Sequence, residues 1–393
     1  MGRALSLYAP AMAFTRAITL ARVLLLTWLL GPSEFGTWGL GMMVFSILAP
    51  IAVLGSHQGI ARYVSFYQAR GRLREFLRRA ATGICFVAGC TGLTALACSG
   101  WIARLLASTS GASEPIGHQL LVVIAVLGVV NGLLMALYHN LQACMRGMRT
   151  FRLLAAMELT YAFLFTVGAL VGGAVWPRGY TVLIAHASSL AILLAVGGWA
   201  ARSCLAYHGD RPPPDQDAAA GPPDEPDNVP VLARLLRFGV VAMLAPMVWN
   251  LGNQVSAWFI HRHHGSEALG VYIPYRQLCQ PVWVLSGIVW GLVFSYVVRH
   301  WEFRLRPEAA RMLNVAYKGV VLTLMTVSVL IRATRTWWGM LLPEAYRDGL
   351  GALPGLLLFF QCSANLGMFS IVAKLREKPM TIVAVLFAGA AVN

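Results

Sequence analysis

Charged residues are scarce in this chain of 393 residues. They make up 12% of the sequence, about half the share of a soluble globular domain. Acidic residues are the scarcer sign, with 16 Asp and Glu against 31 Lys and Arg. Hydrophobic residues make up 58%, and the mean hydropathy is +0.65. This composition excludes a soluble domain, and we expect an integral membrane protein.

Sequence signals for metal, redox or nucleic-acid chemistry are also missing. The seven cysteines form no CxxC motif, and most lie within apolar runs, as small core residues do. His261, His263 and His264 form a short cluster, but no carboxylate or thiol spacing supports a metal site there. The net charge of +15 comes from cations that lie between apolar segments. We therefore expect no cofactor, no metal and no nucleic-acid partner.

The apolar segments are long enough to cross a bilayer as helices. A spanning helix needs roughly 20 apolar residues, the runs are too long for transmembrane strands of ~10 residues, and helices pair every backbone group internally. About eleven spans are predicted, at 5–30, 37–56, 81–103, 119–141, 153–175, 180–201, 238–260, 271–298, 312–331, 350–373 and 380–393. The expected fold class is an all-α polytopic membrane protein.

The distribution of Lys and Arg predicts the orientation of the chain. If the N-terminus is cytoplasmic, 22 of the 31 cations lie in cytoplasmic segments, 6 lie in external segments, and three lie within spans. Cytoplasmic loops carry such an excess in membrane proteins. We therefore expect a multi-pass membrane protein with a cytoplasmic N-terminus.

Residues 203–233 interrupt the apolar pattern. The segment holds seven prolines and six of the sixteen acidic residues, a composition typical of a flexible linker. It divides a six-helix bundle, 1–202, from a second bundle, 234–393. The two bundles, about 6 + 5 helices, are expected to surround a central cavity.

The opening of the second bundle resembles that of the first. Gly36-Thr37-Trp38 aligns with Gly270-Val271-Tyr272, and each half continues with a span, a basic turn and another span. Two copies with the same orientation are typical of parallel-repeat transporters. Residues 380–393 would reach only about 20 Å as a helix, so we expect the second bundle to be incomplete.

Few charged side chains lie within the predicted spans. Arg16, Arg22 and Arg276 do, and a cation at mid-bilayer costs at least ~2.5–3.5 kcal/mol on insertion scales. We interpret them as residues of a cavity that binds an anion, because the guanidinium fork fits phosphate. The alternative is that Arg22 only extends its side chain toward an interface. Arg16 and Arg22 are six residues apart, so they point about 120° apart.

Three amide side chains share one face of the span that opens the second half. Asn250, Asn253 and Gln254 have helical spacing, and such a set suits sugar hydroxyl groups. The alternative is that they join helices through hydrogen bonds.

Two stretches carry a family resemblance. Leu29-Leu30-Gly31-Pro32, followed by Glu34-Phe35-Gly36, and later Leu341-Leu342-Pro343-Glu344-Ala345-Tyr346 resemble motifs of bacterial polysaccharide flippases. The interior Arg22 and the basic stretch from Arg62 to Arg79 belong to the same resemblance. These flippases belong to the multidrug/oligosaccharidyl-lipid/polysaccharide (MOP) exporter superfamily.

The resemblance implies a flippase for O-antigen or exopolysaccharide precursors. It would translocate a polyprenyl-diphosphate-linked oligosaccharide by alternating access, with the diphosphate on Arg16, Arg22 and Arg276 and the sugar on Asn250, Asn253 and Gln254. The expected partners are the lipid-linked oligosaccharide, the bilayer and other membrane proteins of polysaccharide assembly. Two alternatives stay open within the superfamily, a peptidoglycan-precursor flippase and a drug/cation exporter. A polysaccharide polymerase or ligase is the enzymatic alternative, but the external loops are short and pair no nucleophile with a base, so we expect no enzyme.

Overall fold

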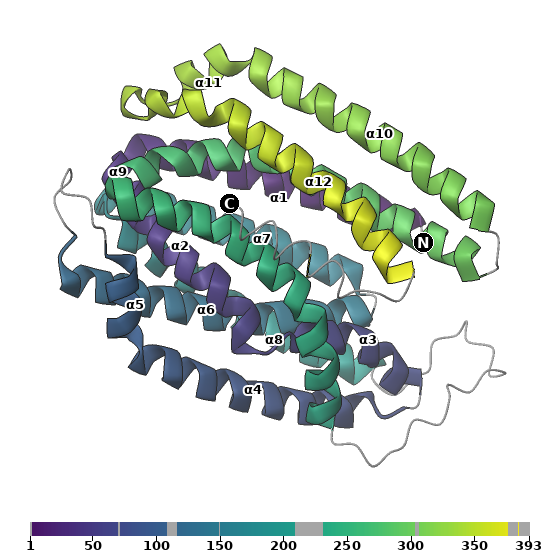
Figure 1. The fold of residues 1–393 in the computed structure, drawn as a ribbon. Helices are drawn as coiled ribbons and strands as arrows, with labels where there is room; N and C mark the ends of the chain where they lie inside the picture. The colour runs from purple at the N-terminus through teal and green to yellow at the C-terminus, as the bar shows by residue number, and fades with distance from the viewer. Residues whose placement is uncertain are drawn as a thin grey trace.

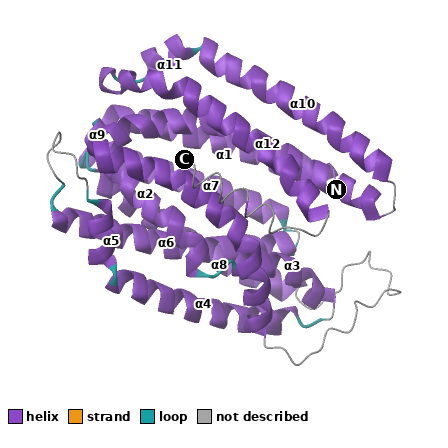
Figure 2. Ribbon diagram, in the orientation of Figure 1, coloured by secondary structure: helices purple, strands orange, loops and turns teal. Residues whose placement is uncertain are grey.

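The computed structural model describes residues 2–69, 71–107, 116–148, 150–208, 231–302, 306–375 and 384. Within these ranges the chain forms helices joined by turns, and no strand (Figure 2). The elements are α1 (Gly2–Leu29), α2 (Pro32–Ala52), α3 (Ser56–Ala69), α4 (Leu73–Ala97), α5 (Ser99–Leu106), α6 (His118–Gly147), α7 (Phe151–Val175), α8 (Gly179–His208), α9 (Val231–Glu302), α10 (Arg306–Ala333), α11 (Arg335–Leu341), the 3-10 helix η1 (Glu344–Ala352) and α12 (Leu353–Leu375).

Seven helical segments of the described part are long and apolar enough to cross a membrane. They cover α2, α4, α6, α7, α8, α10 and a segment from η1 into α12. The all-α, polytopic membrane fold is therefore confirmed, although the exact division into 6 + 5 helices is not. The short final run, 380–393, lies outside the described residues apart from the helical residue at 384.

Several boundaries differ from the prediction. The span expected at 81–103 begins at Leu73 and is followed by the separate α5. Its first turns hold arginines that the apolar window excluded; Glu75 pairs with Arg72 at 3.2 Å and with Arg79 at 2.6 Å, so these turns remain helical.

The basic stretch after α2 is helical as well. It was expected as a turn, but α3 forms there, with Tyr63, Val64 and Tyr67 buried. Its apolar face is narrow, and this is why hydropathy alone did not reveal it. The predicted linker, 203–233, begins later than expected, because α8 continues to His208.

The helices form an elongated arrangement with two distinct ends (Figure 1). One end holds α5 and α11 and is called the α11 end; the other holds the N-terminus and α3 and is called the α3 end. Helices α10 and α12 lie together along one side, and α4 lies on the opposite side, with α2 and α9 between them (Figure 1). Buried residues of α1, α2, α6, α9, α10 and α12 belong to one continuous hydrophobic cluster.

Helix α9 consists of two segments that meet at Gly265. The backbone there has φ 85° and ψ −178°, a conformation that only glycine adopts at low cost. The chain reverses at this residue, so 231–264 and 266–302 correspond to the two spans predicted at 238–260 and 271–298. The turn lies at the α11 end (Figure 1).

The second segment of α9 crosses the start of α2 at two glycines. A Cβ atom on Gly36 would overlap the carbonyl oxygen of Ser266, and a Cβ atom on Gly270 would overlap the carbonyl oxygen of Pro32. Ser33 and Ser266 lie beside this contact, with their hydroxyl oxygens 3.2 Å apart. Because Gly36 and Gly270 are the residues that align in the sequence, each half offers the same site to the other half.

Substitution of either crossing glycine should weaken the fold. Gly36→Ala or Gly270→Ala would press a methyl group against main chain, which cannot move aside as a side chain can. We expect each to lower the free energy of unfolding by about 1–3 kcal/mol, as overpacking does. Thermal unfolding in detergent measures the effect. Gly89→Ala is the matched control, because nothing lies within 4 Å of its Cβ position; an equal loss in the control would contradict the close crossing.

Candidate functional site

Arg22 is a buried cation inside the first half of the chain. Its side chain is 6% exposed, and its guanidinium carbon lies 3.9 Å from the centre of the Phe165 ring on α7. Nη1 donates a long hydrogen bond, 3.5 Å, to the hydroxyl of Thr166. Nε is buried and has no partner among the described residues. The guanidinium is therefore held by one weak hydrogen bond and a cation–π contact, and no carboxylate of the described residues forms an ion pair with it.

Polar side chains of α6, α7 and α8 extend the environment of Arg22. The hydroxyl of Tyr161 lies 2.6 Å from Nε2 of His186, which packs on the same Phe165 ring as Arg22. One helical turn from Tyr161, the Glu158 carboxylate accepts a hydrogen bond of 2.7 Å from Gln142, whose oxygen accepts one of 3.2 Å from Arg146. Glu158 is thus held by neutral and cationic groups within the first half.

The other two predicted arginines have different environments. Arg16 is exposed on α1, and its charge acts on Glu158. Arg276 is half-buried in the second segment of α9, one turn from Tyr272. No hydrogen bond or ion pair within the described ranges joins Arg16, Arg22 and Arg276 to one another. Their assignment as one diphosphate site stays a prediction.

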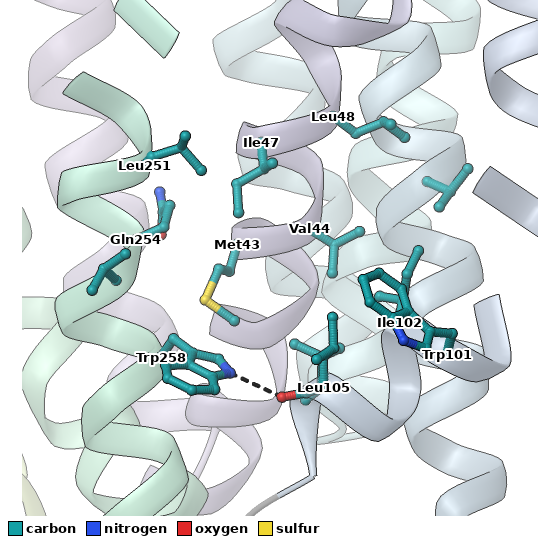
Figure 3. A pocket seen from close by; sticks show the side chains of 13 residues that line it. Met43, Val44, Ile47, Leu48, Trp101, Ile102, Leu105, Leu251, Gln254 and Trp258 are labelled. Atoms are coloured by element: carbon teal, nitrogen blue, oxygen red, sulfur yellow. Dashed lines mark hydrogen bonds between the residues drawn. The ribbon is translucent and has the colours of Figure 1, made fainter. Parts of the chain in front are cut away.

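The predicted amide set lies on the first segment of α9. Asn253 is buried and donates to the carbonyl of Trp249 at 3.0 Å, whereas Asn250 is half-buried. Gln254 lines a cavity of about 430 Å³ between α2, α5, α6 and α9 (Figure 3). The other lining side chains are apolar or aromatic: Met43, Val44, Ile47, Leu48, Trp101, Ile102, Leu105, Leu106, Val129, Leu251, Val255 and Trp258. Gln254 is the polar side chain of this cavity.

Three side chains of α9 hold the end of α5 at one mouth of this cavity. Trp258 Nε1 donates to the carbonyl of Leu105 at 2.9 Å (Figure 3). One turn further on, a ring nitrogen of His261 lies 2.7 Å from the carbonyl of Leu106, and Arg262 donates to that of Ala107 at 2.6 Å. His261 of the histidine cluster therefore serves a contact between the two halves of the chain.

A second set of contacts closes the α11 end. The hydroxyl of Tyr346 donates to the carbonyl of Leu30 at 2.6 Å, and its own carbonyl accepts from Tyr275 at 2.8 Å. Trp28 Nε1 donates to the carbonyl of Leu341 at 2.9 Å. The ring of Phe35, wholly buried, meets Tyr346 edge-on. The two motifs that carry the family resemblance thus touch each other across more than 300 residues of sequence.

Glu34 joins the starts of α2 and α8 at the same end. One carboxylate oxygen accepts from Arg178 at 2.8 Å, and the other accepts from the backbone N–H of Gly179 at 2.8 Å. Gly179 is the first residue of α8, so Glu34 caps a helix N-terminus. The hydrogen bond from Arg178 to Glu34 raises the pKa of the Arg178 guanidinium. Every residue of the motif Glu34-Phe35-Gly36 therefore contacts another part of the chain.

Tyr161, Thr166 and His186 are not among the residues predicted from the sequence. Each lies within an apolar run, and His186 is wholly buried in α8. A polar side chain within a membrane-spanning run is the sequence signal that could have identified these residues. Helical periodicity places them on their own helices, but it cannot show that α7 and α8 face α1 at Arg22.

Comparisons with solved structures identify the fold. The inward-facing conformation of a multidrug resistance MATE family transporter of the MOP superfamily aligns with a TM-score of 0.66 and 14% identity, over 96% of this chain and 84% of that chain. The outward-facing conformation of such a transporter aligns with a TM-score of 0.61 and 13% identity, over 98% of this chain and 84% of that chain. A MOP superfamily transporter from Pyrococcus furiosus aligns with a TM-score of 0.59 and 14% identity, over 98% of this chain and 84% of that chain. The reversed polarity of its binding pocket suggested a different function for that protein. The fold is that of MOP superfamily transporters.

The sequence itself matches a known protein family. Residues 5–293 match the family described as "Polysaccharide biosynthesis protein". The chain belongs to this family, and the resemblance seen in the motifs is confirmed. No curated protein matches the chain in sequence.

Removal of the Glu34 carboxylate should destabilise the α11 end. Glu34→Ala leaves the first N–H of α8 without its acceptor, and loss of such a cap costs about 0.5–2 kcal/mol. Glu34→Gln keeps an acceptor oxygen and should retain most of the stability. Thermal unfolding of both variants measures the difference. If the alanine and glutamine variants unfold at the same temperature, the cap on Gly179 contributes nothing.

Proposed function

We propose that this protein is a flippase that moves a polyprenyl-diphosphate-linked oligosaccharide across the bacterial inner membrane. Membership of the polysaccharide biosynthesis family and the MOP transporter fold support this proposal. The two bundles, 1–202 and 234–393, rock against each other so that a central site faces one leaflet at a time. In this proposal the α3 end lies in the cytoplasm, as the excess of Lys and Arg predicts.

The buried Arg22 is the observation that supports an anionic substrate most directly. A cation removed from water is costly unless other groups balance its charge. Around Arg22 the described residues supply a hydroxyl, an aromatic face and a histidine, and leave Nε without a partner. A diphosphate oxygen would provide the missing negative charge and acceptor.

The remaining predicted residues take the other parts of the substrate. Arg16 and Arg276 supply further cations along its path, and Asn250 and Asn253 supply amides for sugar hydroxyls. The apolar cavity beside Gln254 offers a surface for the first part of the polyprenyl chain. Polysaccharide-assembly proteins of the same membrane would supply the substrate and consume the product.

Loss of the Arg22 charge should abolish most of the transport. Arg22→Gln removes a charge-assisted hydrogen bond, typically 1.5–3 kcal/mol, so we expect a loss of about 10- to 100-fold. Arg22→Lys keeps the charge but not the planar fork, and should be intermediate. The measurement is complementation of a flippase-deletion strain, in which surface polymer is compared with lipid-linked repeat units retained inside.

The control for this experiment is Arg104→Gln, at an exposed position on α5. Protein levels in the membrane must be equal for all variants. Binding of undecaprenyl diphosphate and undecaprenyl monophosphate to the purified protein then separates affinity from transport. If Arg22→Gln transports as well as Arg104→Gln does, Arg22 is structural and the substrate site lies elsewhere.

Alternating access requires the α11 end to open, and this can be blocked by a crosslink. Ser33 and Ser266 lie on the two halves with hydroxyl oxygens 3.2 Å apart, a separation compatible with the short Cβ–Cβ distance that a disulfide requires. In a variant lacking the native cysteines, Ser33→Cys with Ser266→Cys should form a disulfide under oxidation. We expect transport to stop when it forms and to recover with a reductant.

A disulfide within the first half provides the matched control. Ser56 and Asn140 are hydrogen-bonded at 2.9 Å, and both belong to this half. A crosslink between cysteines at these two positions should leave transport unchanged. Full transport in the oxidised Ser33–Ser266 variant would contradict opening at the α11 end.

A drug exporter is the second candidate, and the apolar cavity favours it. Aromatic and aliphatic walls with one amide suit a hydrophobic cation, and Glu158 is a half-buried carboxylate in the first half that could bind a coupling cation. Ethidium efflux from cells distinguishes the two functions. Efflux by the wild type that Glu158→Gln abolishes would support the exporter, and efflux indistinguishable from that of empty cells would remove it.

A further inference from the structure

A second groove lies near the α3 end, beside the place where the start of α9 packs on α3 and α4. Its volume is about 520 Å³, and α3, α4, α6 and α8 form its walls. Helix α6 packs against both α4 and α8 and forms the floor. Three arginines line the groove, Arg74 and Arg78 on α4 and Arg202 on α8. Neither the substrate path nor the closing contacts use these residues.

The groove is cationic at one end and apolar along the rest. Arg74 and Arg78 lie in the first turns of α4, and Arg202 lies near the end of the antiparallel α8, so all three are at the α3 end. Leu77 and Ala201 lie beside the arginines, and further along the walls are formed mainly by Ile84, Cys85 and Leu137. From Arg74 to Cys85 the α4 wall extends about 16 Å. This polarity matches an amphiphile with an anionic head and an apolar chain.

The polar groups of the apolar wall are already satisfied. Asn140 accepts a hydrogen bond from Ser56 at 2.9 Å and donates one to the carbonyl of Ala136 at 2.9 Å. Thr82 donates to the carbonyl of Arg78 at 3.0 Å. These groups therefore do not require water in the groove, and an acyl chain can lie against them without leaving an unpaired polar atom.

The carboxylate of Glu75, in the first turn of α4, forms ion pairs with arginines outside the groove. Glu75 pairs with Arg72 and Arg79, which are not lining residues. Arg78 and Arg202 are exposed and form no ion pair within the part of the chain that the structure describes. There is also space beside α8, because nothing lies within 4 Å of a Cβ atom placed on Gly198.

We propose that this groove is a binding site for an anionic phospholipid of the cytoplasmic leaflet. Its phosphate lies between Arg78 and Arg202, with Arg74 beside it, and one acyl chain runs along Leu137, Leu141 and Gly198. The expected cytoplasmic position of the α3 end puts the arginines at the depth of the headgroups. The site is separate from the transported substrate, so it does not depend on which substrate the protein moves.

The test is binding of phosphatidylglycerol to the purified full-length chain, with phosphatidylcholine as the neutral lipid. Native mass spectrometry of the protein in detergent measures the lipid bound at each concentration. We expect the wild type to prefer phosphatidylglycerol. Each arginine near a lipid headgroup contributes about fivefold, so Arg78→Ala with Arg202→Ala should weaken binding about 25-fold and remove the preference.

A steric variant tests the acyl-chain part without changing charge. Gly198→Leu fills the groove from α8 and should weaken phosphatidylglycerol binding at least about tenfold. Its control is Gly319→Leu on α10, which is exposed and also has nothing within 4 Å of its Cβ position. The charge control is Arg306→Ala with Arg311→Ala, two exposed arginines at the start of α10. All variants must give one monodisperse species and unfold near the wild-type temperature.

Four results would overturn the proposal. Equal loss in the α10 charge control would mean that the lipid responds to surface charge alone. Displacement of phosphatidylglycerol by inorganic phosphate would assign the arginines to a small anion. Unchanged binding in Gly198→Leu would exclude the acyl chain from the groove. A tenfold gain in lipid binding after replacement of the acidic residues of 209–230 by neutral ones would assign the groove to that segment of the chain instead.

Discussion

The crossing of α2 and α9 at Gly36 and Gly270 is the constraint on which the rest of the structure depends. Backbone meets backbone there, so the two helices can approach only because neither residue has a side chain. The residues beside the crossing make further contacts of the α11 end: Glu34 caps the start of α8, and Phe35 meets Tyr346. Tyr346 in turn donates to Leu30 at the end of α1. Contacts that look independent in the sequence are therefore neighbours of one helix crossing.

The sequence predicted the apolar helices well, because length and hydropathy decide whether a segment can span a bilayer. It failed for α3 and α5, whose burial depends on neighbours that only the fold supplies: α3 packs on α6 and α9, and α5 on α6. The reciprocal glycines could be aligned from the sequence, but not placed in contact.

At the candidate site, the spacing of Arg16 and Arg22 predicted that the two side chains point in different directions. In the structure Arg16 is exposed and Arg22 is buried. Thr166 and His186 could not be assigned to Arg22, since helices far apart in sequence bring them there.

The surroundings of Arg22 and of Gln254 represent two different ways to hold a polar group away from water. Arg22 keeps its full charge beside an aromatic ring with a single long hydrogen bond, which leaves the need for an anion. Gln254 is neutral and is placed in a wall of Met, Leu, Val and Trp side chains. A substrate with a charged head and an apolar chain would satisfy both environments. A small hydrophobic cation would suit the second environment and would be repelled by the first.

Gly265 explains how one long helix can serve both halves of the molecule. The segment before it packs along the first half: Leu235 and Gly239 contact Gly59 and Gly55 near the α3 end, and Trp258 holds α5 near the other end. The segment after it packs on η1 and α12, through Tyr275 with Tyr346 and Trp290 with Ala364. The residue that separates them has a backbone conformation open only to glycine. In the proposed transport cycle, movement of the second half against the first would separate Gly36 from Gly270. The hydrogen bonds that close the α11 end are mostly made by side chains to main-chain carbonyls, which water can replace. The close glycine crossing would lose only packing, so opening this end would leave no buried polar group without a partner.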